Sequence, residues 1–477
     1  MTITPAVYLP LVGLSDEHHQ LLAKLLNNLS FFQHRNTEKL AYYEGTQRVR
    51  QLGITIPPSL RDIEVVVGWP GTTVDVVEER LDWYGWASEG DDLGLDEVYA
   101  DNALDVDSGK AHLDALIYGT SFVVVGRGGE GEPPVLVTPH SPRTMTGLWD
   151  HRSRRLTAAL ALWFDDDGLM VGASLYTPDE TIVLSHNAGQ WSVENRDRHG
   201  MGRVPVVQFE NRARTDIVGR SEITRTVRSL TDQAVRTMLG MEIHREFYQA
   251  PQRWIMGVDE SQFVDADGNK KTGWETVMGR VLALPRDDEG EVPQVGQFTA
   301  AAPTPYLEQA RGLGQMLATE VGIPPSYLGF QTDNPASADA ILRSEARLVK
   351  RSERRQSSFG KSWLEVARLA LLARDRAVPD SFRDVSARWR EPATPTRSAA
   401  ADEAVKLVQA GVLPPDSRIT YDRIGLSPAE QRLLDAEKRR AAGRGVLETL
   451  QRAAGRQPSP AGQMPEGAPG AEPDNSA

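Results

Sequence analysis

The residues best suited to metal chemistry lie in one acidic stretch, DADGNKKTGWET, which begins at Asp265. Asp265, Asp267 and Asn269 occupy the first, third and fifth positions of a calcium-binding loop. The sixth position of such a loop requires glycine but is Lys270, and the twelfth requires glutamate but is Thr276. We therefore interpret the stretch as a polar turn and expect no metal ion there.

Other motifs for catalysis or nucleotide binding are incomplete. GRGGEG at 126–131 matches a dinucleotide fingerprint by its letters, but it lies between two expected strands and is followed by Glu-Pro-Pro instead of a helix. The chain has no P-loop, no GxSxG serine and no HExxH pair among its nine histidines. The acidic run at 165–167 resembles hairpin chemistry more than a two-metal site, which needs acids from separate elements. We expect no cofactor.

Composition and charge narrow the function classes. The chain has no cysteine, which suits a reducing compartment, and it lacks both a signal peptide and a long apolar run, so we expect a cytosolic location. The formal net charge of −13 argues against a protein that wraps nucleic acid. Residues 75–107 contain twelve acids and one base, whereas residues 337–376 contain ten bases and five acids. These segments are either solvated faces that pack near each other, or surfaces for separate partners.

Hydrophobic spacing predicts a mixed α and β chain. Helices are expected from Ser15 to about Gly45, from Thr72 or Thr73, and from about Leu95 to Tyr118 with an end at Gly119. TSFVVVG and PVLVT predict a hairpin, and four further apolar runs between 156 and 210 predict an antiparallel meander.

The second half of the chain is expected to be mainly helical. A helix from Ser221 to Pro251 and another after Pro303 flank a small mixed module. A further helix begins near Asn334, but residues 350–358 read KRSERRQSS without an apolar side chain. A helix that is polar all round must bridge solvent, meet a charged partner or fail to form, so we expect this part to have no core of its own.

Five stretches of the chain are informative when they are taken together and in their order. They are YYEGTQRVRQLGITIPPSLRD (42–62), GWPGTTVDVVEERLDWYGW (68–86), NRARTDIVGRSEITRTVRSLTDQAVRTM (211–238), APQRWIMG (250–257) and NPASADAILRSEARLVKRSERRQ (334–356). Together they resemble the portal proteins of tailed double-stranded DNA bacteriophages, particularly those of phages of actinobacteria. The resemblance runs from about residue 15 to residue 455, and it rests on joint occurrence because no stretch is a catalytic motif.

The resemblance implies an α+β portal fold with a mixed α/β wing, long stem helices, a small α/β clip, a long channel helix with a tunnel loop, and a helical crown. The implied boundaries are a wing at 1–210, a first stem helix at 211–250, a clip at 251–302, a second stem helix at 303–326, a tunnel loop at 327–337, the channel helix and the rest of the wing at 338–395, a crown at 396–455 and a disordered tail at 456–477.

The same resemblance implies a ring, usually of twelve subunits, at one capsid vertex, through which DNA is packaged, retained and ejected. Such a protein is a structural part of the virion, is assembled in the host cytoplasm and performs no chemistry of its own. Its implied partners are other copies of itself, the terminase large subunit, a head-completion adaptor, the major capsid and scaffolding proteins and, transiently, double-stranded DNA, with no membrane.

Three groups of residues follow from this mapping. The tunnel loop places four polar residues toward DNA: Gln331, Thr332, Asp333 and Asn334. The channel helix carries four bases that either pair with acids across the subunit boundary or contact phosphates: Lys350, Arg351, Arg354 and Arg355. The clip offers charged residues to the terminase or the adaptor: Asp265, Asp267, Lys270, Lys271, Asp287 and Asp288.

Two alternative functions remain open from the sequence. A metal-dependent nuclease would need acids that converge from separate elements, and the sequence contains no motif that indicates them. Another virion component, such as a capsid or scaffolding protein, would share the succession of helix, module and helix. A scaffold should be more helical and simpler in composition, and the expected β-meander speaks against it.

Overall fold

The structure is a computed structural model, and it describes thirteen stretches of the chain. They are residues 13–49, 63–88, 90, 92–187, 190–216, 218–249, 253–256, 292, 294–297, 302–330, 338–393, 397–426 and 428–454. The chain divides into two compact units, Met1–Ala393 and Thr394–Ala477. The expected tunnel-loop contacts at 331–334, the charged clip residues at 265–288 and the C-terminal tail lie outside the described residues.

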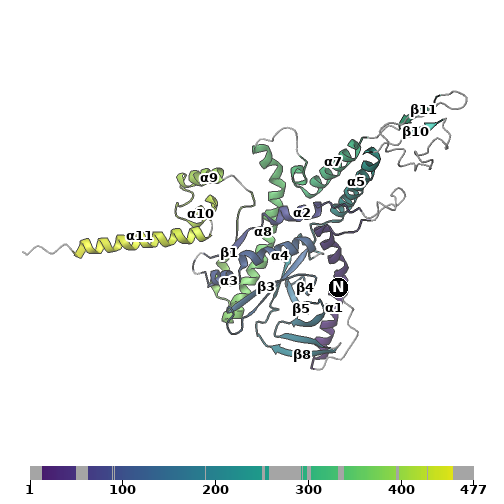
Figure 1. The fold of residues 1–477 in the computed structure, drawn as a ribbon. Helices are drawn as coiled ribbons and strands as arrows, with labels where there is room; N and C mark the ends of the chain where they lie inside the picture. Colours follow the sequence, from purple (N-terminus) through teal and green to yellow (C-terminus); the bar gives the residue numbers. More distant parts are fainter. Residues whose placement is uncertain are drawn as a thin grey trace, which may run out of the picture. The chain divides into compact units, whose positions relative to one another are not determined.

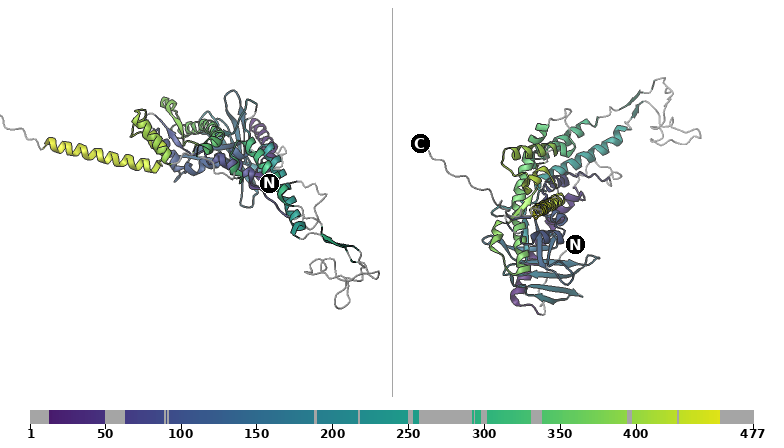
Figure 2. Two further views of the ribbon diagram at one scale, coloured as in Figure 1. Left: turned by 90° about the horizontal axis from the view of Figure 1, so that it is seen from above. Right: turned by 90° about the vertical axis from the view of Figure 1, so that its left-hand side faces the viewer.

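The first unit begins with helix α1 (Asp16–Glu44), which packs on a five-stranded sheet (Figures 1 and 2). Ser15 caps the helix through its side chain, and Gly45 ends it in the left-handed conformation with φ 73°, as the sequence predicted. The strands form a continuous antiparallel meander: β4 (Met145–Asp150), β5 (Arg155–Phe164), β6 (Met170–Tyr176), β7 (Thr181–Asn187) and β8 (Gln190–Asp197). Leu25 and Leu29 of α1 are fully buried against this sheet.

A second sheet has three antiparallel strands in the order β3-β2-β9. Its strands are β2 (Thr120–Arg127), β3 (Val135–His140) and β9 (Val206–Glu210). The predicted hairpin is the β2–β3 pair, and GRGGEG forms its connecting loop. Because no helix follows that loop, the nucleotide-binding interpretation has no structural basis.

Two helices cover this sheet: α4 (Leu104–Tyr118) and the 38-residue α8 (Ala338–Asp375). The helices α2 (Trp69–Glu78) and α3 (Leu95–Asp101) pack on α4, and together the four enclose the main core. The short strand β1 (Trp83–Ala87) pairs with β12 (Ser386–Trp389) beside them, after the short 3-10 helix η4 (Asp380–Asp384). Trp83 stacks on Trp363 with ring centroids 3.9 Å apart, and the Trp363 indole donates to Nε2 of His112 at 2.9 Å. This aromatic cluster ties α8 to the N-terminal half of the unit.

Two long helices, α5 (Arg225–Gln249) and α7 (Thr304–Val321), pack side by side (Figure 1). Strands β10 (Arg253–Met256) and β11 (Gln294–Gln297) pair beyond their ends, so the predicted succession of helix, module and helix is present in the described residues. A 3-10 turn, η3 (Pro325–Leu328), follows α7.

The second unit contains three helices among its described residues: α9 (Arg397–Gln409), α10 (Arg418–Ile424) and α11 (Pro428–Ala454). Ser417 caps α10 through its hydroxyl, and Gly425 ends it with φ 85°. The helical content expected for 398–455 is therefore present.

Three boundary predictions were wrong. The helix expected from Ser221 begins at Arg225 as α5, so Glu222 lies in the segment before the helix. Helix α2 begins at Trp69, because Pro70 suits its first turn, and the hydroxyl of Thr73 bonds to the Trp69 carbonyl inside the helix instead of capping it. The single helix expected up to Tyr118 is two helices, since Ala103 has φ 47° and interrupts the chain between α3 and α4.

Candidate functional site

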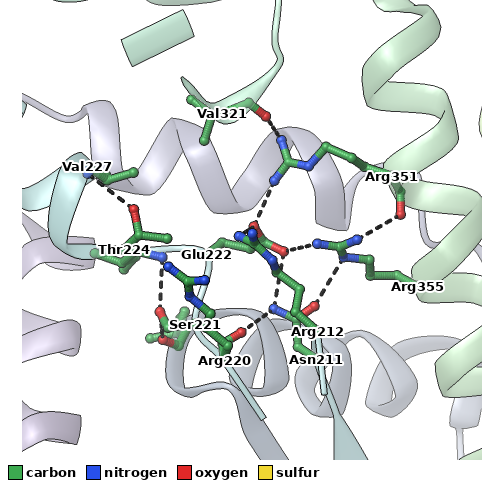
Figure 3. A network of polar contacts seen from close by, with 12 residues as sticks. Asn211, Arg212, Arg220, Ser221, Glu222, Thr224, Val227, Val321, Arg351 and Arg355 are labelled. Carbon is green, nitrogen blue, oxygen red and sulfur yellow. Dashed lines mark hydrogen bonds and ion pairs between the residues drawn. The ribbon is translucent and has the colours of Figure 1, made fainter. Parts of the chain in front are cut away.

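Glu222 is the centre of a buried charge network between α5 and α8 (Figure 3). Its carboxylate accepts from Arg355 Nη2 at 2.6 Å, from Arg351 Nη2 at 2.7 Å and from Arg212 Nη1 at 3.2 Å. The Asn211 side-chain amide donates a fourth bond at 3.2 Å. Glu222 is 0% exposed, so the three guanidinium groups satisfy a charge that water cannot reach.

The helical period brings the two α8 arginines to the same carboxylate. Arg351 and Arg355 are four residues apart and therefore lie on one face of the helix. Arg351 also donates to the Val321 carbonyl at the end of α7, and Arg355 donates to Asn211 Oδ1 at 3.1 Å. The network thus joins α8, the last residue of α7 and the segment that leads into α5.

A tight turn places Glu222 and Asn211 side by side. The Asn211 backbone amide donates to the Gly119 carbonyl at 3.0 Å, and the Glu222 backbone amide donates to the Leu116 carbonyl at 2.9 Å. A Cβ on Gly219 would lie 2.1 Å from the Gly119 oxygen, so only glycine fits this crossing of two backbones.

The charges fix the ionisation of the network. Burial opposes ionisation of Glu222, but the guanidiniums of Arg355, Arg351 and Arg212 outweigh burial and hold the Glu222 pKa below its usual value. Burial lowers the pKa of Arg351 against the effect of Glu222, yet a guanidinium keeps its proton at any pH at which a protein folds. The contacts are therefore ion pairs.

A second polar cluster holds the N-terminal half of α8. Arg80 Nη2 lies 3.2 Å from Glu345 Oε2 and donates to the Tyr327 hydroxyl at 3.0 Å. Tyr327 in turn donates to Glu345, and Arg80 Nη1 donates to the Pro392 carbonyl at 2.6 Å. Burial, followed by the bond to Glu345, raises the pKa of Tyr327. Arg80 is the only base of the acidic segment at 75–107, and its charge is paired with Glu345 inside the protein.

The expectation that 350–358 lacks a core of its own chain was wrong. Ser352 is 0% exposed and Arg355 is 7% exposed, because the residues facing them include Glu222 and Asn211 of the same chain. Arg351 and Arg355 therefore pair with an acid of their own chain, and not with acids of a neighbouring subunit. One signal for this arrangement was visible in the sequence, namely the spacing of four residues between two arginines.

The opposite face of α8 carries exposed bases. Five of them are spaced four, three, four and seven residues apart, which puts them on one side of the helix: Arg343, Arg347, Lys350, Arg354 and Lys361. Lys350 pairs with Glu353 of the same helix at 2.6 Å, and Arg347 donates to the Thr319 carbonyl at 2.7 Å. Arg354 has no partner in the part of the chain that the structure describes. We call these five residues the basic stripe.

Neither a metal centre nor a membrane span emerges from the described ranges. Within them, no three histidine, aspartate or glutamate residues converge in a way that could hold a metal ion. Within the same ranges, no helix combines the length and the apolar character needed to cross a bilayer.

Comparisons with known proteins place this chain in a family of structural proteins. Residues 22–443 match the family model described as "Phage portal protein, SPP1 Gp6-like". The chain therefore belongs to the phage portal protein family, whose members are structural components of the bacteriophage virion. The resemblance seen in the sequence is confirmed.

Two relatives carry the name portal protein. The one from Mycobacterium phage D29 is 34% identical over 428 residues, which cover 86% of this chain and 87% of the relative. The one from Mycobacterium phage L5 is 33% identical over 428 residues and covers 86% of each chain. A solved structure of the neck of an empty GTA particle, computed with C6 symmetry, contains a similar chain with a TM-score of 0.40 and 13% identity, covering 82% of this chain and 99% of that one.

Proposed function

We propose that copies of this portal protein close into a ring of twelve subunits at one capsid vertex, and that double-stranded DNA passes through the ring during packaging, retention and ejection. Membership of the portal family supports this proposal. The observation that carries it is the division of α8 into two faces. One face is sealed by Glu222 and the aromatic core, whereas the other presents the basic stripe to its surroundings.

The charge of the stripe suits a conduit in which DNA slides. Each neutralised phosphate strengthens binding steeply at low salt, so a channel lined densely with bases would grip the duplex. The whole chain is acidic, with a net charge of −13, and Lys350 is already paired with Glu353. Arg354 and Lys350 therefore provide few and weak contacts, either to phosphates or to the next subunit.

The remaining parts take their roles from the same mapping. In this proposal α5 and α7 are the stem helices, residues 1–210 with part of 338–395 form the wing, and 396–455 form the crown. Residues 327–337 form the tunnel loop, in which Gln331, Thr332, Asp333 and Asn334 approach DNA. Residues 251–302 form the clip, whose charged side chains (Asp265, Asp267, Lys270, Lys271, Asp287 and Asp288) meet the terminase large subunit and later the adaptor. Capsid and scaffolding proteins surround the ring, which assembles in the host cytoplasm.

Negative-stain microscopy of the purified full chain tests the proposal. Rings with a central hole are the expected result, and monomers that persist at high protein concentration would overturn it. Incubation of the same sample with duplex DNA and Mg²⁺ or Mn²⁺ should leave the DNA intact, because the ring performs no chemistry of its own in this proposal. Cleavage that is lost on chelation would favour the nuclease alternative.

A further inference from the structure

A cavity of about 770 Å³ opens where the β4–β5 hairpin, β9 and α8 meet. Five cationic side chains line it: Arg154, Arg155, Arg203, Arg214 and Lys361. Two carboxylates, Glu210 and Glu365, also line it. The cavity therefore carries an excess of positive charge, in contrast to the chain as a whole.

Three of these cations are uncommitted. Arg203 pairs with Glu365, and Arg214 lies 3.3 Å from Asp216. The side chains of the other three, Arg154, Arg155 and Lys361, are exposed and have no partner within the described ranges. Lys361 is the last member of the basic stripe, so the stripe ends in the cavity. A site with three unpaired cations is complementary to an acidic surface.

Such an acidic surface lies on α3 and the first turn of α4. It consists of four exposed carboxylates: Asp96, Glu97, Asp101 and Asp105. None of the four forms an ion pair with a described residue, although Asp107 pairs with Lys110 nearby. Val106, between Asp105 and Asp107, is 61% exposed. A single exposed valine is ordinary, so the unpaired carboxylates are the feature that makes this surface complementary to the cavity.

The two surfaces border opposite edges of one sheet. The sheet order is β3-β2-β9. At the β3 edge, the side chain of Asn102, between α3 and α4, donates to the Val135 carbonyl at 2.9 Å and accepts from the Val137 amide at 2.8 Å. At the β9 edge, Ser358 and Ser362 of α8 donate to β9 carbonyls beside the cavity. Because the surfaces are on different sides, they cannot satisfy each other within one chain.

We propose that the cavity binds the acidic α3–α4 surface of a second copy of this chain. The contact rests on the ring proposed above and assigns its subunit boundary. A contact between different surfaces is heterologous, so it repeats head to tail and closes when the rotation per subunit allows it. Each subunit offers one cavity and one acidic surface, so every cavity in a closed ring is filled.

Reversal of charge on each surface separately tests the contact. The cavity variant is Arg154→Glu with Arg155→Glu, and the acidic-surface variant is Asp101→Lys with Asp105→Lys. Alone, each variant opposes like charges at every boundary, which strongly disfavours association. We expect the fraction of subunits in rings, measured by mass photometry at about 0.1 M salt, to fall at least about tenfold for each variant. Circular dichroism checks that both variants fold.

An equimolar mixture of the two variants gives the decisive measurement. In a mixed ring with alternating subunits, each reversed cavity meets a reversed acidic surface, and each native cavity meets a native acidic surface. Rings should therefore return in the mixture, and also in the single chain that carries all four substitutions. A mixture that stays unassembled would overturn the contact.

Matched controls separate this contact from general charge effects. Asp166→Lys with Asp167→Lys makes the same charge change as the acidic-surface variant, but in the exposed β5–β6 turn, and should leave ring formation unchanged. If both surface variants form normal rings, the proposed contact is overturned but the proposed ring is not. If a cavity variant still forms rings but no longer binds duplex DNA, the cavity is a DNA site and the contact is overturned. Wild-type protein that never forms rings would overturn the proposed function itself.

Discussion

Arg355 and Glu222 are 133 positions apart in the sequence, yet Nη2 of the arginine lies 2.6 Å from Oε1 of the glutamate in the interior of the protein. The contact fixes the middle of α8 to the segment that leads into α5. Since Arg351 and Arg212 bind the same carboxylate, the loss of this single acid leaves three guanidiniums without their counter-charge.

We predict that Glu222→Gln destabilises the first unit by about 3–5 kcal/mol, because it breaks a buried ionic network and leaves uncompensated charges. Urea or thermal unfolding followed by circular dichroism measures the change. The matched control is Glu353→Gln, which removes an acid from an exposed pair with Lys350 and should change stability by less than about 0.5 kcal/mol. Equal effects of the two variants would contradict a structural role for the network.

The pH dependence of stability should report the same carboxylate. The folded-state pKa of Glu222 is below its usual 4.5, so its contribution is fully present above pH 4.5 and is lost as the pH falls through the folded-state value. Wild-type stability should therefore drop below pH 4.5 relative to Glu222→Gln, in which this proton-linked loss is absent. Parallel curves for the two proteins would show that Glu222 has the same pKa in both states.

His112 predicts a separate acid effect at higher pH. Burial lowers its pKa from 6.5 to about 3, and its Nε2 accepts the Trp363 indole N–H. The unfolded chain takes up a proton below pH 6.5 while the folded chain does not, so stability falls as the pH decreases from 6.5 toward 3, by up to about 1.4 kcal/mol per unit. His112→Phe should remove this slope, at a constant cost of about 1–3 kcal/mol for the unpaired indole. The difference between the two proteins, measured by urea unfolding from about pH 7 to about pH 5, isolates the effect, and a difference independent of pH would contradict it.

The glycine at the crossing of two backbones gives a purely steric prediction. Gly219→Ala would place a Cβ 2.1 Å from the Gly119 oxygen, and the adjacent turn that positions Glu222 must move. We expect a loss of more than about 2 kcal/mol in the free energy of unfolding. Gly312→Ala is the control, because nothing lies within 4 Å of its Cβ in α7, and there alanine should be neutral or stabilise by up to about 1 kcal/mol.

The basic stripe predicts a change in DNA affinity without a change in assembly. Lys350→Gln with Arg354→Gln should leave rings intact and reduce the salt dependence of duplex binding by about 1 for each phosphate that is no longer neutralised. Arg383→Gln, at a side chain that is 85% exposed on η4, is the control for loss of an exposed base outside the stripe. Fluorescence anisotropy across a salt series measures the slopes. If rings dissociate instead, the two residues belong to the subunit boundary.

Much of this fold could be predicted from local patterns. The end of α1 at Gly45 and the meander of apolar runs require only short-range information, namely a left-handed cap and alternation along strands. The order of the helices around 221–321 also followed from spacing and proline positions. Such features depend on neighbours in the sequence, which are visible without the structure.

The burial of Arg351 and Arg355 could not be predicted in the same way. A run of nine polar residues is typical of a solvated helix, and the acid that neutralises it lies more than a hundred residues earlier in an ordinary stretch, SEIT. Similarly, the break at Ala103 depends on Asn102 reaching the β3 backbone, a tertiary contact. The four-residue spacing of the two arginines indicates a shared helix face, but no periodic signal identifies an acid that lies 133 residues away.

The two hydrogen bonds of the Asn102 side chain to β3 have one more consequence. An uncovered strand edge would template the addition of a strand from another molecule, a route to sticky, irreversible aggregates in a crowded host cell. With that edge occupied by the Asn102 side-chain amide, a strand from another molecule cannot add to β3.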